Sequence, residues 1–184
     1  MLVLAQTGVG KEAAASGIDK IINAVRYNVP SCTQFIGPAE IASGQALLSY
    51  LAKISPCFVS IVGEFGLRMQ QLCSPRASSA EIQLRRIMLD LYNKSGSNSV
   101  LKPTIYADKD KNTALVQSPA FSMLGESTPE RFFEIVDDGM ISEGLLPRFT
   151  LIEYKGKRPP LNENHIFVNP SVSICDKLLS LIHS

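Results

Sequence analysis

A glycine-rich turn stands between a short apolar run and a helical pattern at the start of this chain of 184 residues. Residues 1–6 form the apolar run, and residues 11–26 repeat apolar side chains with the period of a helix. Gly8 and Gly10 permit the backbone to curl, so that successive N–H groups point at one anion beside the positive end of the following helix. Lys11 adds a cation that reaches phosphate groups. The pattern predicts a buried strand, a phosphate-binding loop and a helix.

The remainder of the chain alternates strand and helix patterns, which predicts an α/β fold with a mostly parallel sheet and helices on its faces. Strands are expected at 33–36, 58–62, 121–124 and 149–154, and helices at 39–54, 65–72, 80–92, 129–136 and 170–183. The polar segment 93–112, with a β-like patch at 104–106, is expected to be an exposed loop or hairpin. We expect one core over residues 1–154, followed at 155–184 by a basic, proline-rich exit and a C-terminal helix. Because the loop begins so close to Met1, we also expect a piece of a longer chain.

Composition limits the classes of function. The net charge of +1 excludes a whole-chain electrostatic footprint for nucleic acid, although a local basic patch remains open. The four cysteines have no paired spacing and no nearby histidines, which disfavours a zinc site and a disulfide framework and fits the cytoplasm. No apolar run reaches the roughly 18 residues that span a bilayer, so no membrane partner is expected.

The predicted loop supplies the nucleotide-binding residues. They are Gln6, Thr7, Gly8, Val9, Gly10, Lys11 and Glu12. Glu12 occupies the place where a serine or threonine would put a hydroxyl on Mg²⁺, and a carboxylate there can bind the metal or a water on it. The alternative interpretation is a glycine-rich turn between strand and helix with a solvated lysine.

An acid follows the apolar strand at 58–62. Glu64 at such a strand end can orient an attacking water and help to neutralise charge around a metal, so Glu64 and Glu12 are the predicted metal ligands. Gly63 stands where an aspartate usually precedes that acid, and Glu12 can compensate for it. A glutamate that only faces solvent is the alternative.

Two further segments carry candidate residues. The strand at 121–124 runs into Ser127 and Thr128, either of which can sense the terminal phosphate, although Thr128 before Pro129 is also a good helix N-cap. Arg148 precedes the last strand. It is a candidate for an arginine that reaches a phosphate across a subunit boundary, with a surface or ion-paired arginine as the alternative.

In this order, the motifs resemble the P-loop ATPase domains of phage, prophage and plasmid replication proteins, which are related to RecA-like hexameric helicases and often lie downstream of primase modules. The resemblance covers roughly residues 1–154, from the loop through Pro38 to Leu48, Ser60 to Gly66 and Leu124 to Pro129, to the segment that ends at Phe149. It implies a RecA-like P-loop NTPase core that hydrolyses ATP with Mg²⁺, in which Lys11 binds phosphate, Glu64 is the catalytic acid and Arg148 acts in trans. It also implies a homo-oligomeric ring, single-stranded DNA as a partner and a primase module in the same longer chain.

Three functions compete. The first is an ATP-driven, helicase-like replication protein. In it, the loop at 93–112 contacts DNA phosphates through Lys94, Lys102, Lys109 and Lys111. The alternative for this loop is a solvated segment that does not contact DNA. The second is a degenerate module that binds nucleotide without turnover and acts in oligomerisation or partner loading. The third, an enhancer-binding transcription ATPase, is suggested only by the GxGKE form of the loop and ranks last. A serine or cysteine hydrolase has no supporting motif.

Overall fold

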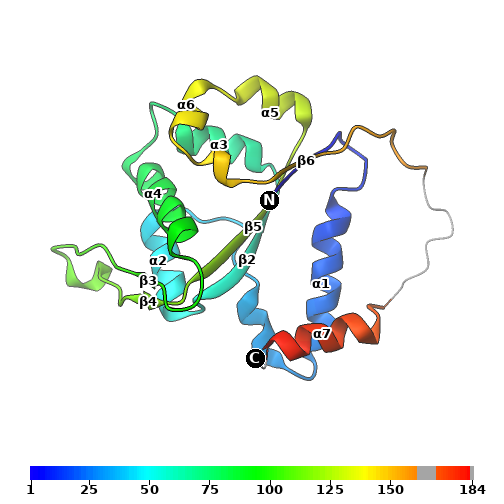
Figure 1. Cartoon of the computed structure of the whole chain (residues 1–184), viewed down its shortest axis with the longest axis horizontal. Helices are drawn as coiled ribbons and strands as arrows, with labels where there is room; N and C mark the ends of the chain where they lie inside the picture. The colour runs from blue at the N-terminus through cyan, green and yellow to red at the C-terminus, as the bar shows by residue number, and fades with distance from the viewer. Residues whose placement is uncertain (161–168, 183–184) are drawn as a thin grey trace.

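A parallel sheet of four strands forms the centre of the molecule. The computed structural model describes residues 1–160 and 169–182. The sheet order is β2-β5-β1-β6, and all neighbouring strands are parallel (Figure 1). The strands are β1 (Leu2–Leu4), β2 (Cys57–Val62), β5 (Ala120–Ser127) and β6 (Leu151–Glu153). The prediction of an α/β fold with a mostly parallel sheet is confirmed.

The register of the strands decides which segments meet beyond the sheet. Leu4 pairs with Ser127 of β5 and with Glu153 of β6, so these three strands end at the same level. On the other side of β5, Val62 at the end of β2 pairs with Gly125. Because parallel strands run in one direction, the segments after β1, β2, β5 and β6 all leave from one side of the sheet. We call this side the carboxyl edge.

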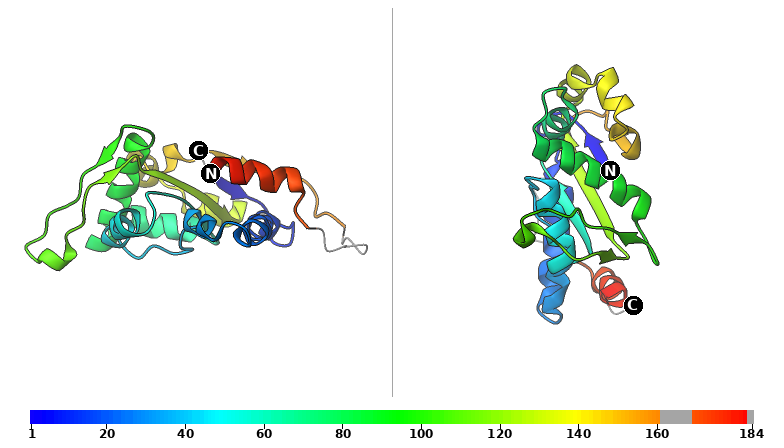
Figure 2. Two further views of the ribbon diagram at one scale, coloured as in Figure 1. Left: turned by 90° about the horizontal axis from the view of Figure 1, so that it is seen from below. Right: turned by 90° about the vertical axis from the view of Figure 1, so that its left-hand side faces the viewer.

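One face of the sheet packs on the hydrophobic core. Alternate residues of the strands, such as Leu2 and Leu4 of β1 and Phe58 of β2, point into it. The helices that cover this face are α2 (Gly44–Lys53), α3 (Phe65–Cys73), α4 (Ser79–Lys94), α5 (Pro129–Ile135) and α6 (Asp138–Ser142) (Figure 2). Phe65 and Phe132 are among the largest fully buried side chains that they contribute.

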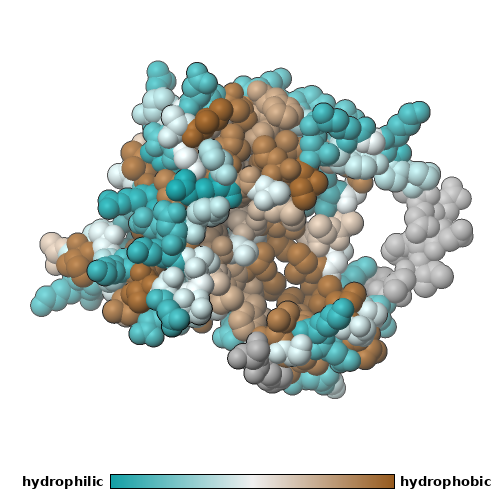
Figure 3. Space-filling model, in the orientation of Figure 1, coloured by the Kyte–Doolittle hydropathy of each residue, from teal (hydrophilic) through white to brown (hydrophobic). Residues whose placement is uncertain are grey.

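The second group of helices lies apart from this core. Helix α1 (Glu12–Arg26) packs against the 3₁₀-helix η1 (Pro30–Phe35) and the C-terminal helix α7 (Val172–Ile182) (Figure 1). Val25 is the one buried residue of α1, and no described residue of α7 is buried. Apolar surface therefore stays open on this side, as Figure 3 shows over α7.

Most predicted elements are present with shifted ends. The helices expected at 11–26, 65–72, 80–92, 129–136 and 170–183 are α1, α3, α4, α5 and α7, and the later strands are β2, β5 and β6. Strand β1 is shorter than predicted and ends at Leu4, because the chain bends there into the glycine-rich loop. Helix α6 and the 3₁₀-helix η3 (Leu146–Arg148) were not predicted. The exit at 155–160 has no helix or strand, and its continuation at 161–168 lies outside the described residues.

Two predictions about the first half of the chain are wrong. The strand expected at 33–36 is a 3₁₀-helix that begins at Pro30, and only Ile36 forms a single parallel bridge, to Val59 of β2. The helix expected from residue 39 begins at Gly44. Ser43 sets this start because its side chain accepts a hydrogen bond from the N–H of Ala46, which is an N-cap.

The polar segment after α4 forms a hairpin that projects from the body (Figure 1). Its strands are β3 (Val100–Leu101) and β4 (Val116–Gln117), which pair antiparallel, and a 3₁₀ turn, η2 (Lys109–Lys111), lies between them. The expectation of an exposed loop or hairpin is confirmed, but 104–106 is not a strand. Tyr106 instead exchanges two hydrogen bonds with the side chain of Asn112.

The first turn of α3 touches the end of β5 at a glycine. A Cβ placed on Gly66 would lie 2.5 Å from Oγ of Ser127 and 3.1 Å from its Cβ. We expect Gly66→Ala to lower the free energy of unfolding by about 1–3 kcal/mol, because the added methyl group overpacks this contact. Urea denaturation measures the change. Gly17→Ala in α1, where a Cβ meets nothing within 4 Å, is the control and should stabilise the chain by about 0.5–1 kcal/mol; equal effects would contradict the contact.

Candidate nucleotide-binding site

The glycine-rich loop leaves the carboxyl edge directly after β1. Ala5 is buried, and its N–H donates to the carbonyl of Ser127 at 3.2 Å, which fixes the start of the loop on β5. The chain then curls through Gly8 (φ +81°) and Gly10 (φ +90°) into α1. Both glycines occupy the left-handed region that side chains disfavour, so the sequence places them where this turn requires them.

The backbone N–H groups of residues 6–11 are not used by the fold. They donate to none of the residues that the structure describes, and most of the loop is exposed. Backbone donors are normally paired in a folded protein, with protein groups, water or a ligand. These donors lie at the N-terminal end of the 15-residue helix α1, whose dipole favours negative charge. The segment therefore has the backbone donors and the helix field of an anion-binding loop.

The side chain of Lys11 folds back onto the start of the loop. Its Nζ donates to the carbonyl oxygen of Ala5 at 2.7 Å and approaches the carbonyl oxygen of Ser127 at 3.5 Å. The ammonium group thus lies across the strand ends of β1 and β5 instead of extending into solvent. A cation held there is already in position to meet an anion bound by the surrounding N–H groups.

Glu64 has a strained backbone at the end of β2. Its φ of 50° and ψ of 33° are left-handed, a conformation that costs a residue other than glycine about 1 kcal/mol. It is the N-cap residue of α3, yet its side chain makes no capping hydrogen bond. The other described residues besides glycine that have a positive φ are Asn98 and Ser118, which lie next to the hairpin strands. The fold therefore keeps an exposed carboxylate at the carboxyl edge in a backbone conformation that is unfavourable for glutamate.

Glu126, which the sequence did not single out, lies between these groups on β5. Its pKa is raised above the usual value, first by burial and then by the negative charges of Glu12 and Glu64, while Lys11 opposes the shift. Each of the three partners therefore acts electrostatically on one half-buried carboxyl group. In the segment 125–128, the sequence predicts roles only for Ser127 and Thr128. The importance of Glu126 depends on β5 lying next to β1, which is a long-range pairing.

The raised pKa of Glu126 leads to a stability prediction. Above its folded-state pKa, ionised Glu126 destabilises the fold, whereas below the ordinary value of 4.5 it is protonated in both the folded and the unfolded chain. Glu126→Gln should therefore raise the thermal midpoint at pH 7, and the gain should shrink as the pH falls to 4.5 and below. Thermal unfolding without nucleotide or magnesium measures it, with the exposed Glu134→Gln on α5 as the control. A gain independent of pH would contradict this account.

The acids at the carboxyl edge can take part in a magnesium site but do not form one alone. In the described part of the chain, no group of three or more metal-ligating side chains is close enough to hold an ion. Mg²⁺ in phosphate-processing sites is held by one or two carboxylates, with phosphate oxygens and waters completing the shell. Glu12 and Glu64 are exposed and both act on Glu126, so they fit this requirement.

Among the described residues, the side chains of Ser127 and Thr128 form no hydrogen bond with the loop. The Ser127 side chain is buried against Gly66, and its Oγ has no partner among the described residues. Its link to the loop is its carbonyl oxygen, which accepts from Ala5 and faces Lys11. Thr128 is the N-cap residue of α5 without a side-chain capping bond.

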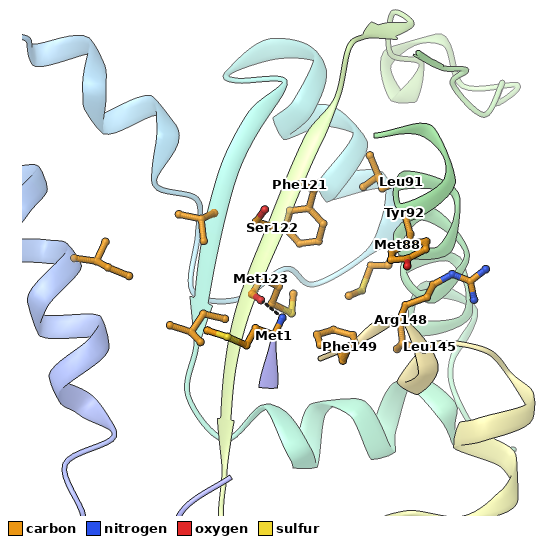
Figure 4. Close-up of a pocket in the computed structure, with 13 residues that line it drawn as sticks. Met1, Met88, Leu91, Tyr92, Phe121, Ser122, Met123, Leu145, Arg148 and Phe149 are labelled. Atoms are coloured by element: carbon orange, nitrogen blue, oxygen red, sulfur yellow. Dashed lines mark hydrogen bonds between the residues drawn. The ribbon is translucent and has the colours of Figure 1, made fainter. Parts of the chain in front are cut away.

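Arg148 lies away from the loop of its own chain. It ends η3 just before the amino end of β6, where one guanidinium nitrogen donates to the carbonyl of Gly144 at 2.7 Å. The guanidinium also lies 5.3 Å from the ring centroid of Tyr92, and Nε is buried without a partner in the described structure. Arg148 and Tyr92, together with Met1 and Phe121, line a mainly apolar cavity of about 450 Å³ (Figure 4). The structure does not bring Arg148 together with Lys11 and Glu64.

Comparison with known proteins adds no identity. No protein family, curated protein or solved structure matches this chain. None of the helices in the described ranges has the length and apolarity that crossing a bilayer requires. Of the lysines considered for DNA contact, Lys94, Lys102 and Lys109 are exposed, and the side chain of Lys111 lies outside the described part.

A second pocket opens beside the loop at the same edge. It has a volume of about 380 Å³ and lies between the end of β1, the start of α5 and the exit from β6. Its lining residues are Gln6, Pro129, Glu130, Glu153, Tyr154, Lys155, Gly156 and Lys157. Gln6 bridges two of these walls, because its Nε2 donates to Oε1 of Glu130 at 3.3 Å. The loop thus has adjoining space for more than a phosphate group.

Proposed function

We propose that this chain is the nucleotide-binding core of a P-loop ATPase with a RecA-like fold. The observation that carries the proposal is the loop at 6–11, whose N–H groups bond to no described residue while Nζ of Lys11 lies 2.7 Å from the carbonyl of Ala5. A nucleoside triphosphate supplies the anionic oxygens that such a set of donors can bind. The adjoining pocket of about 380 Å³ offers room for the base and ribose. The parallel sheet flanked by helices is compatible with a RecA-like core.

In the proposed reaction, Lys11 and the loop bind the β- and γ-phosphates of ATP, and Glu64 orients the attacking water. Strand β5 lies between β1 and β2, so the loop and Glu64 leave the carboxyl edge on the two sides of β5. The terminal phosphate and the attacking water would lie between them, beyond the end of β5. Glu12 and Glu64 would hold Mg²⁺, whose charge stabilises the phosphate oxygens. The half-buried Glu126 adds negative charge near Lys11, and a bound metal would offset part of it.

The proposed setting is DNA replication by a helicase-like ATPase of a phage, prophage or plasmid, working as a ring of copies. Arg148 would then act on nucleotide held by a neighbouring copy, and its position away from its own loop supports that role. The exposed lysines of the projecting hairpin would contact the phosphates of single-stranded DNA. A primase module would belong to the same longer chain.

The alternative function uses the same nucleotide-binding site but does not hydrolyse the nucleotide. A module that binds nucleotide without turnover is favoured by Glu12 in place of a hydroxyl residue and by Gly63 in place of an aspartate. Both substitutions reduce the ligands available to magnesium. Such a module would serve in oligomerisation or partner loading.

Steady-state ATP hydrolysis, measured with and without single-stranded DNA, and equilibrium ATP binding together test the proposal against this alternative. We expect magnesium-dependent hydrolysis that DNA accelerates. ATP binding with no hydrolysis under either condition would favour the alternative. Absence of both binding and hydrolysis would overturn both functions.

A further inference from the structure

The segment that follows β6 returns to the glycine-rich loop. The N–H of Tyr154 donates to the carbonyl of Leu4 at 2.8 Å, which extends the pairing with β1 beyond Glu153. The chain then turns tightly, because the Tyr154 hydroxyl donates to the carbonyl of Lys157 at 3.1 Å and a Cβ on Gly156 would collide with the Tyr154 ring. This turn fixes the direction in which the next residue leaves the carboxyl edge.

That next residue is Arg158, and its guanidinium lies over the loop. A Cβ placed on Gly8 would be 3.2 Å from Cζ of Arg158, 3.4 Å from Nε and 3.5 Å from one terminal nitrogen. Gly8 belongs to the part of the loop whose N–H groups bond to no described residue. The guanidinium therefore lies against Gly8 of the glycine-rich loop, whereas the Lys11 ammonium lies against the carbonyl of Ala5.

Among the described residues, the charged side chains of the exit segment differ in their partners. Lys155 is engaged by Glu153, with 3.1 Å between Nζ and Oε2, whereas Arg158 forms no ion pair with a described residue. Arg158 is exposed, so a bound anion would reach it without rearrangement of the core. A guanidinium offers a planar pair of N–H donors that matches two phosphate oxygens at once.

We propose that Arg158 binds the phosphate groups of the nucleotide in the same chain, beside Gly8 of the loop. This inference rests on the proposed function, because it assigns a further residue to the same nucleotide site. It gives the exit segment a role in ligand binding beyond that of a linker. It also gives the loop a second cation from its own chain, in contrast to the role expected of Arg148, which requires a neighbouring copy.

The test compares the binding of three probes to Arg158→Ala and to the unchanged chain, by isothermal titration calorimetry. The probes are ATP with Mg²⁺, inorganic tripolyphosphate with Mg²⁺, and adenosine. We expect Arg158→Ala to weaken ATP and tripolyphosphate alike, by roughly tenfold to a hundredfold, and to leave adenosine unchanged. Arg158→Lys should recover part of the loss because it keeps the charge without the paired donors. Arg86→Ala, at an exposed position of α4, is the matched control and should bind as the unchanged chain does.

The possible outcomes separate this inference from the proposed function. If the unchanged chain binds ATP and Arg158→Ala binds it equally well, the Arg158 assignment is wrong and the loop assignment stands. If Arg158→Ala weakens ATP but not tripolyphosphate, Arg158 contacts the base or ribose and the phosphate assignment is overturned. If the unchanged chain binds neither ATP nor tripolyphosphate, the proposed function itself fails.

Discussion

Lys11→Ala is expected to weaken ATP binding by roughly a hundredfold or more and to remove ATP hydrolysis. The loss corresponds to about 3 kcal/mol, which is the usual contribution of one or two charge-assisted hydrogen bonds between an ammonium group and phosphate. Nζ of Lys11 lies near the carbonyls of both Ala5 and Ser127, so it is the cation held directly against the loop. Equilibrium binding of a fluorescent ATP analogue measures the change.

The control for this experiment is Lys53→Ala, which removes one exposed lysine from the last turn of α2. It should bind the analogue as the unchanged chain does. Circular dichroism should show the same fold for both variants, because Lys11 is only partly buried and its removal deletes no core contact. Equal affinities for Lys11→Ala and Lys53→Ala would mean that the loop does not hold the nucleotide.

Glu64→Gln is expected to slow ATP hydrolysis by roughly 10² to 10⁴-fold, the usual effect of losing a positioned acid or base. The amide keeps the size of the side chain, and Lys11 and the loop still bind the phosphates, so most of the ATP affinity should remain. A companion variant, Glu64→Gly, should hydrolyse as slowly but be more stable by about 0.5–1 kcal/mol, because glycine relieves the left-handed backbone. Single-turnover hydrolysis and urea denaturation measure the two effects.

The exposed acid Glu134 on α5 provides the control for Glu64. Glu134→Gln should hydrolyse ATP at the unchanged rate, because it lies outside the loop and the end of β2. Unchanged hydrolysis in Glu64→Gln would remove that residue from the reaction. Under the alternative function, there is no hydrolysis to lose, and only the gain in stability of Glu64→Gly remains.

The loop and its flanking elements could be predicted because their signals are local. Gly8, Gly10 and Lys11 follow an apolar run and precede a helical pattern, and the structure places a strand, a left-handed turn and α1 there. Glu64 was found in the same way, at the end of a buried strand. Its left-handed backbone was beyond prediction, because the sequence preference of glutamate opposes it.

Other features depend on contacts between distant parts of the chain. Glu126 and Arg158 reach the loop only because β5 and β6 pair with β1 on its two sides, and no local pattern specifies that order. The segment at 33–36 has an apolar pattern that suits a strand, yet the 3₁₀-helix that begins at Pro30 replaces it. The start of α2 was missed because the N-cap at Ser43 outweighs the apolar period that begins before it.

In the proposed function, the N–H groups of the glycine-rich loop bind the phosphates of a nucleotide. Titration of the ¹⁵N-labelled chain with ATP and Mg²⁺, followed by NMR of the backbone amides, observes these groups themselves. We expect saturable shifts concentrated at residues 6–11, reproduced by tripolyphosphate and lost in Lys11→Ala. Shifts confined to other parts of the chain, or no saturable shift at residues 6–11, would contradict it.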